Sequence, residues 1–321
     1  MRKISFIVFS ILLITFSSIF CEEIINFALD ILNLPFPPYQ RNVVKLIEAP
    51  NGLIYGITSA PGNSSGRIFV IDKNYKTHEI NRLPDDVLQV DSVIFNSDIT
   101  WTWDKTRRKI IALDKSGTLK VYDKNGPGKE ILKIAGTRPY EPQGFQISRA
   151  FVQDTTGNLY TAGKDGIMFK FNPETLEIKK LQAKLPAIKG REPWASLDAA
   201  TVGNDGTIYL GTFDGYIASF NPETGTLINL GKPLRQQRIQ SLVFFNGIVF
   251  GIGGESDGLA RWFIYDPLTR GFNLGGTLKS KENKLIYEPV NAMIATNEGV
   301  IIGSFSGRLG SLFIIKTGKE K

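Results

Sequence analysis

One short unit recurs along this chain, and its clearest copy lies between Asp205 and Gly231. It reads DGTIYLGTFDGYIASFNPETGTLINLG, and its runs at 207–211 and 216–220 are rich in β-branched and aromatic residues, which favour strands. Asp214-Gly215 between these runs predicts a type I′ hairpin, because that turn needs positive φ at both central residues. Asn221-Pro222 then ends the second strand, since proline fixes φ and lacks a donor. The unit therefore predicts three antiparallel strands joined by tight turns.

Related units begin near residues 52, 108, 157, 206, 247 and 299, which gives a repeat of about 41 to 55 residues. A further strand precedes each unit, near 44–49, 99–104, 150–154, 197–202, 241–245 and 292–296. Four short strands at this period are typical of a β-propeller. We therefore predict an all-β fold, a six-bladed β-propeller of four-stranded antiparallel blades.

The two ends of the chain complement each other. The last repeat, 299–315, stops before its outermost strand, whereas the segment 24–34 resembles an outermost strand such as 226–233. We therefore expect the N-terminal strand to close the last blade, which would remove exposed sheet edges. An amphipathic helix over 22–34 is the alternative. No linker divides the rest of the chain, so 22–321 is predicted to be a single β-propeller domain.

Residues 1–21 have the composition of an export signal. A basic start precedes an uncharged apolar run at 4–20, as in a secretory signal peptide. An uncleaved anchor is the alternative, although the run is slightly shorter than the roughly 20 residues of a membrane helix. Cys21, the only cysteine, follows the run at the position where bacterial lipoproteins carry their lipidated residue. We expect a secreted or periplasmic protein without disulfides, either soluble or a lipoprotein held at the membrane through Cys21.

Charge and composition exclude several classes of function. The formal net charge of +7 is spread along the chain, which predicts a solvated basic surface, with attraction to anionic glycans or a membrane surface as the alternative. The chain has no cluster of basic and aromatic residues, so we expect no nucleic-acid partner. Its one histidine, His78, lies in a predicted outermost strand. Without a second histidine or another cysteine, Ser-His-Asp, Cys-His and histidine-rich zinc sites are excluded.

The long loops between repeats are where we expect a binding site. With strands lettered A to D from the inside outward, the connections from strand D to the next strand A share one face of a propeller with the B–C turns. Three of these D–A connections contain Glu-Pro, at 141, 192 and 288. Arginine grips carboxylates bidentately and aromatic rings stack on sugars or cations. The candidate ligand-binding residues are therefore Arg138, Tyr140, Glu141, Arg191, Glu192, Trp194, Arg238, Glu288 and Asn291.

An alternative for these Glu-Pro pairs is purely structural. Each would then be a repeat-derived turn whose glutamate pairs with an arginine of a neighbouring blade.

The pattern from Gly206 to Gly225 resembles the blade repeat of two groups of bacterial propellers, the streptogramin (virginiamycin B) lyase-like and the gluconolactonase/regucalcin-like proteins. The resemblance extends over nearly all of 22–321. The lyase group has a catalytic histidine with no counterpart at a predicted channel position here. The Glu-Gly-Pro calcium ligand of the second group is only echoed at Glu141 and Glu192. The resemblance therefore implies the fold and neither activity.

These observations favour a non-catalytic, exported β-propeller with no cofactor and no bound metal. We expect it to bind a polar or anionic small molecule, a glycan or a protein at the cell envelope through its D–A loop face. Its contact with the membrane would be limited to the N-terminus. The alternative is a carbohydrate- or lactone-directed lyase or hydrolase that uses carboxylates, with or without Ca²⁺.

Overall fold

The computed structural model describes residues 29–37, 42–49, 52–59, 67–80, 99–104, 109–114, 118–123, 126–133, 150–235, 238–254, 259–287, 290–296, 300–305 and 311–316. Within these ranges the regular structure is β-strand, apart from two 3-10 turns, η2 (Lys164–Gly166) and η3 (Glu192–Trp194). A search of the same residues found no helix with the length and apolar character needed to span a membrane. The prediction of an all-β fold is therefore confirmed.

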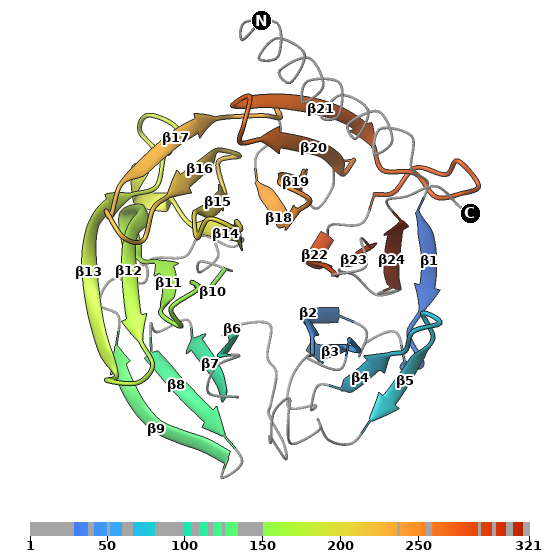
Figure 1. Ribbon diagram of the computed structural model, residues 1–321, viewed down its shortest axis with the longest axis horizontal. Helices are drawn as coiled ribbons and strands as arrows, with labels where there is room; N and C mark the ends of the chain where they lie inside the picture. The colour runs from blue at the N-terminus through green and yellow to red at the C-terminus, as the bar shows by residue number, and fades with distance from the viewer. Residues whose placement is uncertain are drawn as a thin grey trace, which may run out of the picture.

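The described strands form six four-stranded antiparallel sheets, which are arranged around a common centre in Figure 1. The first two sheets contain β2 (Asn42–Glu48), β3 (Ile54–Ser59), β4 (Ile68–Ile71) and β5 (Thr77–Ile80), then β6 (Ile99–Asp104), β7 (Lys109–Asp114), β8 (Thr118–Asp123) and β9 (Gly126–Lys133). The next two contain β10 (Val152–Gln153), β11 (Leu159–Ala162), β12 (Ile167–Asn172) and β13 (Glu177–Lys184), then β14 (Leu197–Val202), β15 (Ile208–Thr212), β16 (Ile217–Phe220) and β17 (Leu227–Gly231). The fifth contains β18 (Ile239–Phe245), β19 (Ile248–Gly253), β20 (Arg261–Asp266) and β21 (Gly271–Thr277).

The sixth sheet joins the two ends of the chain. It combines β22 (Val290–Ala295), β23 (Val300–Phe305) and β24 (Ser311–Lys316) with β1 (Asp30–Asn33), in the order β1-β24-β23-β22. The pairing of β1 with β24 is antiparallel and runs from Asp30 opposite Ile314 to Asn33 opposite Ser311. The N-terminal strand therefore pairs with the last strand, as the sequence predicts, and the alternative of a helix through 30–33 is wrong.

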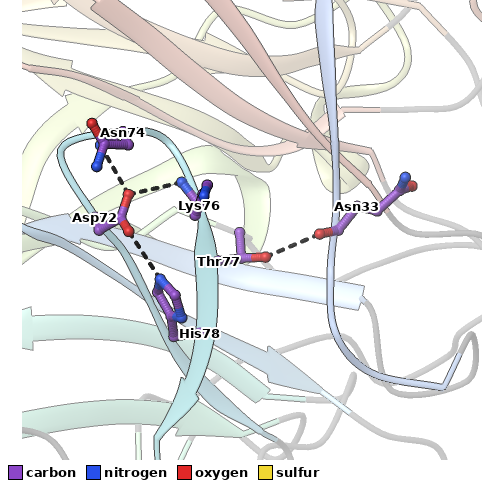
Figure 2. A network of polar contacts seen from close by, with 6 residues as sticks. All are labelled: Asn33, Asp72, Asn74, Lys76, Thr77 and His78. Carbon is purple, nitrogen blue, oxygen red and sulfur yellow. Dashed lines mark hydrogen bonds and ion pairs between the residues drawn. The ribbon is translucent and has the colours of Figure 1, made fainter.

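Both neighbouring sheets also contact β1. At its start, the Asp30 carboxylate lies 2.5 Å from Lys281 Nζ, in the connection that follows β21. At its end, the Thr77 hydroxyl of β5 donates to the backbone carbonyl of Asn33 at 3.0 Å (Figure 2). β1 is thus held by its pairing with β24 along its length and by side-chain contacts at both of its ends.

His78 is the next residue after Thr77 in the outermost strand β5, and its side chain is exposed to solvent. Its Nε2 lies 2.9 Å from Asp72 Oδ2, and Asp72 Oδ1 accepts the backbone N–H groups of Asn74 and Lys76 at 2.8 and 2.9 Å. Figure 2 shows this network. The hydrogen bond with His78, together with those N–H groups, lowers the pKa of the Asp72 carboxyl. The histidine therefore stabilises a turn at the rim, far in the topology from the innermost strands.

Aromatic rings packed on glycines form much of the core. In three sheets a phenylalanine of the third strand lies directly opposite a glycine of the second strand, and its ring covers that glycine. A Cβ built on the glycine would come within 2.0 to 2.2 Å of the ring in Gly56–Phe69, Gly251–Phe263 and Gly303–Phe313. Because the three phenylalanines are fully buried, these positions accept only glycine without repacking.

Candidate functional site

A channel of about 510 Å³ runs between the innermost strands, with walls from β2, β10, β14, β18 and β22. This volume lies in the range of small-molecule sites in proteins, about 300 to 1,000 Å³. The innermost strands are edge strands, because each pairs with a neighbour on one side only. The channel is therefore bordered by strand edges and by those side chains that turn out of the sheets.

A β-bulge near the start of four innermost strands supplies such side chains. In four of these strands the register shifts across a single residue, and the residues concerned are Val44, Asp198, Gln240 and Asn291. A bulge leaves its extra residue out of the ladder and re-aims its side chain. The last three are polar and line the channel. We call the end of the channel formed by Asp198, Gln240 and Asn291 the D–A mouth, because D–A connections lead into these strands.

The two amides at the D–A mouth bridge neighbouring sheets. Gln240 accepts the backbone N–H of Val290 at 2.8 Å and donates to the carbonyl of Gly254 at 2.7 Å. Asn291 donates to the carbonyl of Val43 at 3.0 Å. Each bulge residue therefore reaches the first residues of the next innermost strand, which ties the sheets together around the D–A mouth.

Asp198 makes the corresponding contact as an ion pair. Its Oδ2 lies 2.8 Å from Arg238 Nε. The two atoms form an ion pair, but they are not aligned as a hydrogen bond requires. The Asp198 side chain is 0% exposed and that of Arg238 is 13% exposed. Removing one partner of so buried a pair leaves an uncompensated charge, which typically costs about 3 to 5 kcal/mol.

The backbone of Arg238 is held between two sheets in a rare conformation. Its φ is +69°, in the left-handed region that costs a non-glycine residue roughly 1 to 2 kcal/mol. Its N–H donates to the carbonyl of Phe213 at 2.6 Å, and its carbonyl accepts the N–H of Gly254 at 3.1 Å. These two hydrogen bonds hold the backbone of Arg238 in this conformation. Strained residues at functional sites are held by their surroundings in the same way.

Arg191 joins the same cluster from the preceding D–A connection. Its Nη2 lies 3.3 Å from Oδ1 of Asp214, whose side chain is 2% exposed, and Asp214 Oδ2 accepts the N–H of Ile188 at 3.1 Å. The guanidinium carbons of Arg191 and Arg238 each lie 5.7 Å from the ring centre of Phe213, within the range of a cation–π contact. Two arginines, two aspartates and one aromatic ring thus gather beside the D–A mouth.

Asp214 also explains a turn that differs from its sequence prediction. The type I′ assignment for Asp214-Gly215 is wrong, because Gly215 has positive φ, at +85°, and Asp214 does not. The carboxylate of Asp214 is engaged by Arg191 and Ile188, contacts that a local turn rule does not contain. In the corresponding turn, Asp165 and Gly166 have φ of +59° and +70°, as type I′ requires.

Comparison with known proteins identifies the fold. No protein-family model and no curated protein matches the chain. Among solved structures, a streptogramin B lyase is 11% identical, with a TM-score of 0.61 over 91% of this chain and 99% of that chain. A catalytically inactive virginiamycin B lyase from Staphylococcus aureus, solved with quinupristin, is 10% identical, with a TM-score of 0.54 over 90% and 99%. The chain is a β-propeller.

A third similar structure is the extracellular domain of a putative hybrid two-component system from B. thetaiotaomicron. It is 15% identical to this propeller, with a TM-score of 0.53 over 87% of this chain and 34% of that chain. Identities this low establish the propeller fold alone, because unrelated functions share such folds.

The propeller brings together some of the residues predicted from the D–A connections. Arg191 and Arg238 lie in one cluster, and Asn291 lines the channel. Glu192 begins η3, where its own backbone N–H and that of Gly190 lower the pKa of its exposed carboxyl. The backbone of Trp194 ends η3, but its side chain is outside what the structure describes. The remaining predictions lie outside the described residues, namely Arg138, Tyr140, Glu141, Glu288 and Cys21.

Sequence reasoning missed Asp198, Gln240, Phe213 and the pairing role of Asp214. A signal for the first two exists, because the innermost strands begin with an aliphatic residue, a polar residue and then a small one. This pattern occurs as LDA at 197–199, IQS at 239–241 and VNA at 290–292. Both arginines of the cluster pair with aspartates. The alternative of Glu-Pro glutamates paired with arginines stays a prediction, because Glu141 and Glu288 lie outside the described residues.

The described part of the propeller contains no group of three or more His, Cys, Asp or Glu side chains arranged to hold a metal ion. The calcium alternative involves Glu141, outside these residues, so calcium binding stays a prediction.

Proposed function

We propose that this chain is an exported, non-catalytic, six-bladed β-propeller, closed by its N-terminal strand, that binds a polar ligand at the cell envelope through its D–A loop face. The single observation that carries the proposal is the cluster of Arg191, Arg238 and Phe213 beside an open channel, held in place by buried aspartates. Arginines fixed in this way lose little conformational freedom on binding, which lowers the cost of recognition.

The loops that carry this cluster support the same site. Arg191 comes directly before the short turn η3, in the connection from β13 to β14. Arg238 comes directly before β18, at the end of the next D–A connection. Loops held on a rigid scaffold are where propellers and other folds place binding residues. A glycan, a small molecule or a protein loop with hydroxyl, amide or acidic groups would meet guanidinium and amide donors there.

Export is supported by two independent observations. Residues 1–21 have the charge and apolar pattern of a signal peptide, with Cys21 at the lipidation position. Structures similar to this propeller include extracellular domains. We propose a secreted or periplasmic location, with a lipid on Cys21 as the means of membrane attachment.

The absence of catalysis is proposed from the placement of the one histidine. His78 is engaged with Asp72 in an outermost strand, whereas the channel is lined by the innermost strands. Acid–base chemistry near neutrality most often uses histidine within hydrogen-bond reach of the reacting group.

A glycan array probed with the labelled propeller tests the binding function. We expect a hit whose affinity falls at least tenfold in Arg191→Ala and in Trp194→Ala. The matched control is Arg270→Gly, in the exposed turn between β20 and β21, where φ is +55° and glycine fits. If Arg191→Ala and Trp194→Ala leave the affinity of every hit unchanged, the D–A mouth is not the site. Chemical turnover of a bound glycan would instead favour the carbohydrate-directed enzyme.

A further inference from the structure

The channel changes in chemical character along its length. The D–A mouth carries polar side chains at the bulge positions, whereas the later residues of the same innermost strands are mostly apolar. The half-buried apolar residues that line this second part are Ala200 and Val202 of β14, Phe244 of β18, and Met293, Ile294 and Ala295 of β22. We call this part the apolar half of the channel.

The polar and apolar parts lie at opposite ends because neighbouring innermost strands run in the same direction. The starts of β14 and β18 are joined by the ion pair of Asp198 with Arg238, at 2.8 Å. Their far ends are joined by the hydrogen bond from the Phe244 N–H to the Thr201 hydroxyl, at 2.9 Å. A molecule that enters at the D–A mouth therefore meets polar groups first and apolar side chains deeper.

Charge is balanced where the polar part begins. Arg191 and Arg238 are offset by Asp214 and Asp198, and the other two bulge residues there are neutral amides. An anion would compete with the two aspartates for the arginines. Because the Asp198 side chain is fully buried, displacing its partner would leave a buried charge uncompensated. A neutral head group with hydroxyl or amide groups avoids this cost.

Two further charged side chains line the described channel wall at different heights, one near the start of its strand and one beyond the end of its strand. Lys45 of β2 and Asp154, which follows β10, carry opposite charges. Asp154 is engaged locally, since its Oδ1 accepts the N–H groups of Thr156 and Asn158, both at 2.9 Å. Counted together with the ion pair of Asp198 and Arg238, the described channel wall therefore carries equal numbers of positive and negative side chains.

We infer that the channel binds a neutral amphiphile. Its hydroxyl- or amide-bearing head group occupies the D–A mouth, and its aliphatic tail extends along Val202, Phe244 and Met293. This inference rests on the proposed function, because the head group uses the same mouth, and it adds the chemical class of the ligand.

Isothermal titration with three probes tests the inference, namely octyl-β-D-glucoside below its micelle concentration, glucose and octanoate. Each methylene moved out of water contributes about 0.8 kcal/mol, which is about fourfold in Kd. Three methylenes buried in the channel would make octyl glucoside roughly 60-fold tighter than glucose. Octanoate, with a charged head, is expected to bind at least tenfold more weakly than octyl glucoside.

Two different substitutions in the apolar half test the affinity advantage of octyl glucoside, so that the conclusion does not depend on a single variant. Ala200→Leu narrows the apolar half, and Met293→Ser removes apolar surface, so both should abolish most of the advantage of octyl glucoside over glucose. The matched control is Leu274→Ser in the outermost strand β21, where the leucine is 64% exposed. An advantage lost in this control would mean adsorption to the outer surface and would overturn the inference.

The outcomes separate the inference from the proposed function. Equal affinities for glucose and octyl glucoside, both weakened by Arg191→Ala, would overturn the inference and leave the polar site standing. In another outcome, the affinity advantage of octyl glucoside over glucose is lost in the channel variants and unchanged in Arg191→Ala. This result would support the apolar half and contradict the proposed mouth. No binding of octyl glucoside at millimolar concentration would overturn the inference.

Discussion

The contact between Gly251 and Phe263 offers a sharp test of how the sheets are packed. The two residues face each other on β19 and β20, and the Phe263 side chain is fully buried. A Cβ on Gly251 would lie 2.2 Å from Phe263 Cζ and 2.8 Å from Leu242 Cδ2, whereas ordinary contact begins at 3.4 Å. In Gly251→Ala the ring must therefore shift by about 1 Å in a densely packed interior.

This shift sets the size of the expected effect. Overpacking a core typically costs about 1 to 3 kcal/mol, and the upper end applies because the two strands are fixed by their ladder. A loss of about 3 kcal/mol corresponds to a decrease in Tm of roughly 6 to 12 °C for a large domain. Urea unfolding followed by tryptophan fluorescence and by circular dichroism measures the free energy of unfolding.

Two further variants make the reasoning refutable. Gly276→Ala in β21 is the matched control, because a Cβ there meets nothing within 4 Å, and it should change the free energy of unfolding by less than about 0.5 kcal/mol. Phe263→Leu makes room for the new methyl group, so the double variant should be more stable than the sum of the single effects by at least about 1 kcal/mol. Additive effects, or a Gly251→Ala protein as stable as the parent, would refute this packing.

Three other consequences follow from the described contacts. Deleting residues 22–34 removes β1 and leaves β24 with an unpaired edge, so we expect self-association in size-exclusion chromatography with light scattering; a monodisperse monomer would contradict the closure. Arg238→Ala removes the partner of the fully buried Asp198 and should lower the free energy of unfolding by about 3 kcal/mol or more, whereas Arg270→Ala should change it by less than about 0.5 kcal/mol; equal effects would show that the pair contributes nothing. Burial, and then the charge of Asp205, raise the pKa of Tyr209 to about 12 from the ordinary 10.0. The unfolded chain therefore releases this proton first, and stability should fall as pH rises from 10 to 12; Tyr209→Phe should flatten that fall in urea titrations, and an unchanged slope would contradict the burial.

Much of the fold could be predicted because each repeat carries its own local signals. The alternating strand residues and the turn glycines of 206–225 predicted β15, β16 and the start of β17, and the same pattern located the strands of the other sheets. The missing last strand of the final repeat predicted the pairing of β1 with β24. These features are encoded within about 50 residues, the reach of one repeat.

The candidate site was only partly predictable because its contacts join different repeats. Arg191 and Arg238 were found from their place in D–A connections, but their partners were not. Asp214 looks like a turn residue and Asp198 like a strand residue, and only the folded chain brings them to the arginines. The bulge that re-aims Asp198 depends on register between strands, which single-sequence patterns specify poorly.

The repeated bulge links the stability of the ring to the proposed binding site. Each polar bulge residue lines the channel and at the same time holds the first residues of the next innermost strand, as Gln240 holds Val290 and Asn291 holds Val43. A ligand bound at the D–A mouth, as we propose, would therefore meet a wall whose side chains are already fixed by the packing of neighbouring sheets. Such a site is preorganised, because the entropy of ordering it is lost during folding rather than during binding. The same arrangement limits change at the site, since altering a bulge residue alters both the ligand contacts and the junction between two sheets.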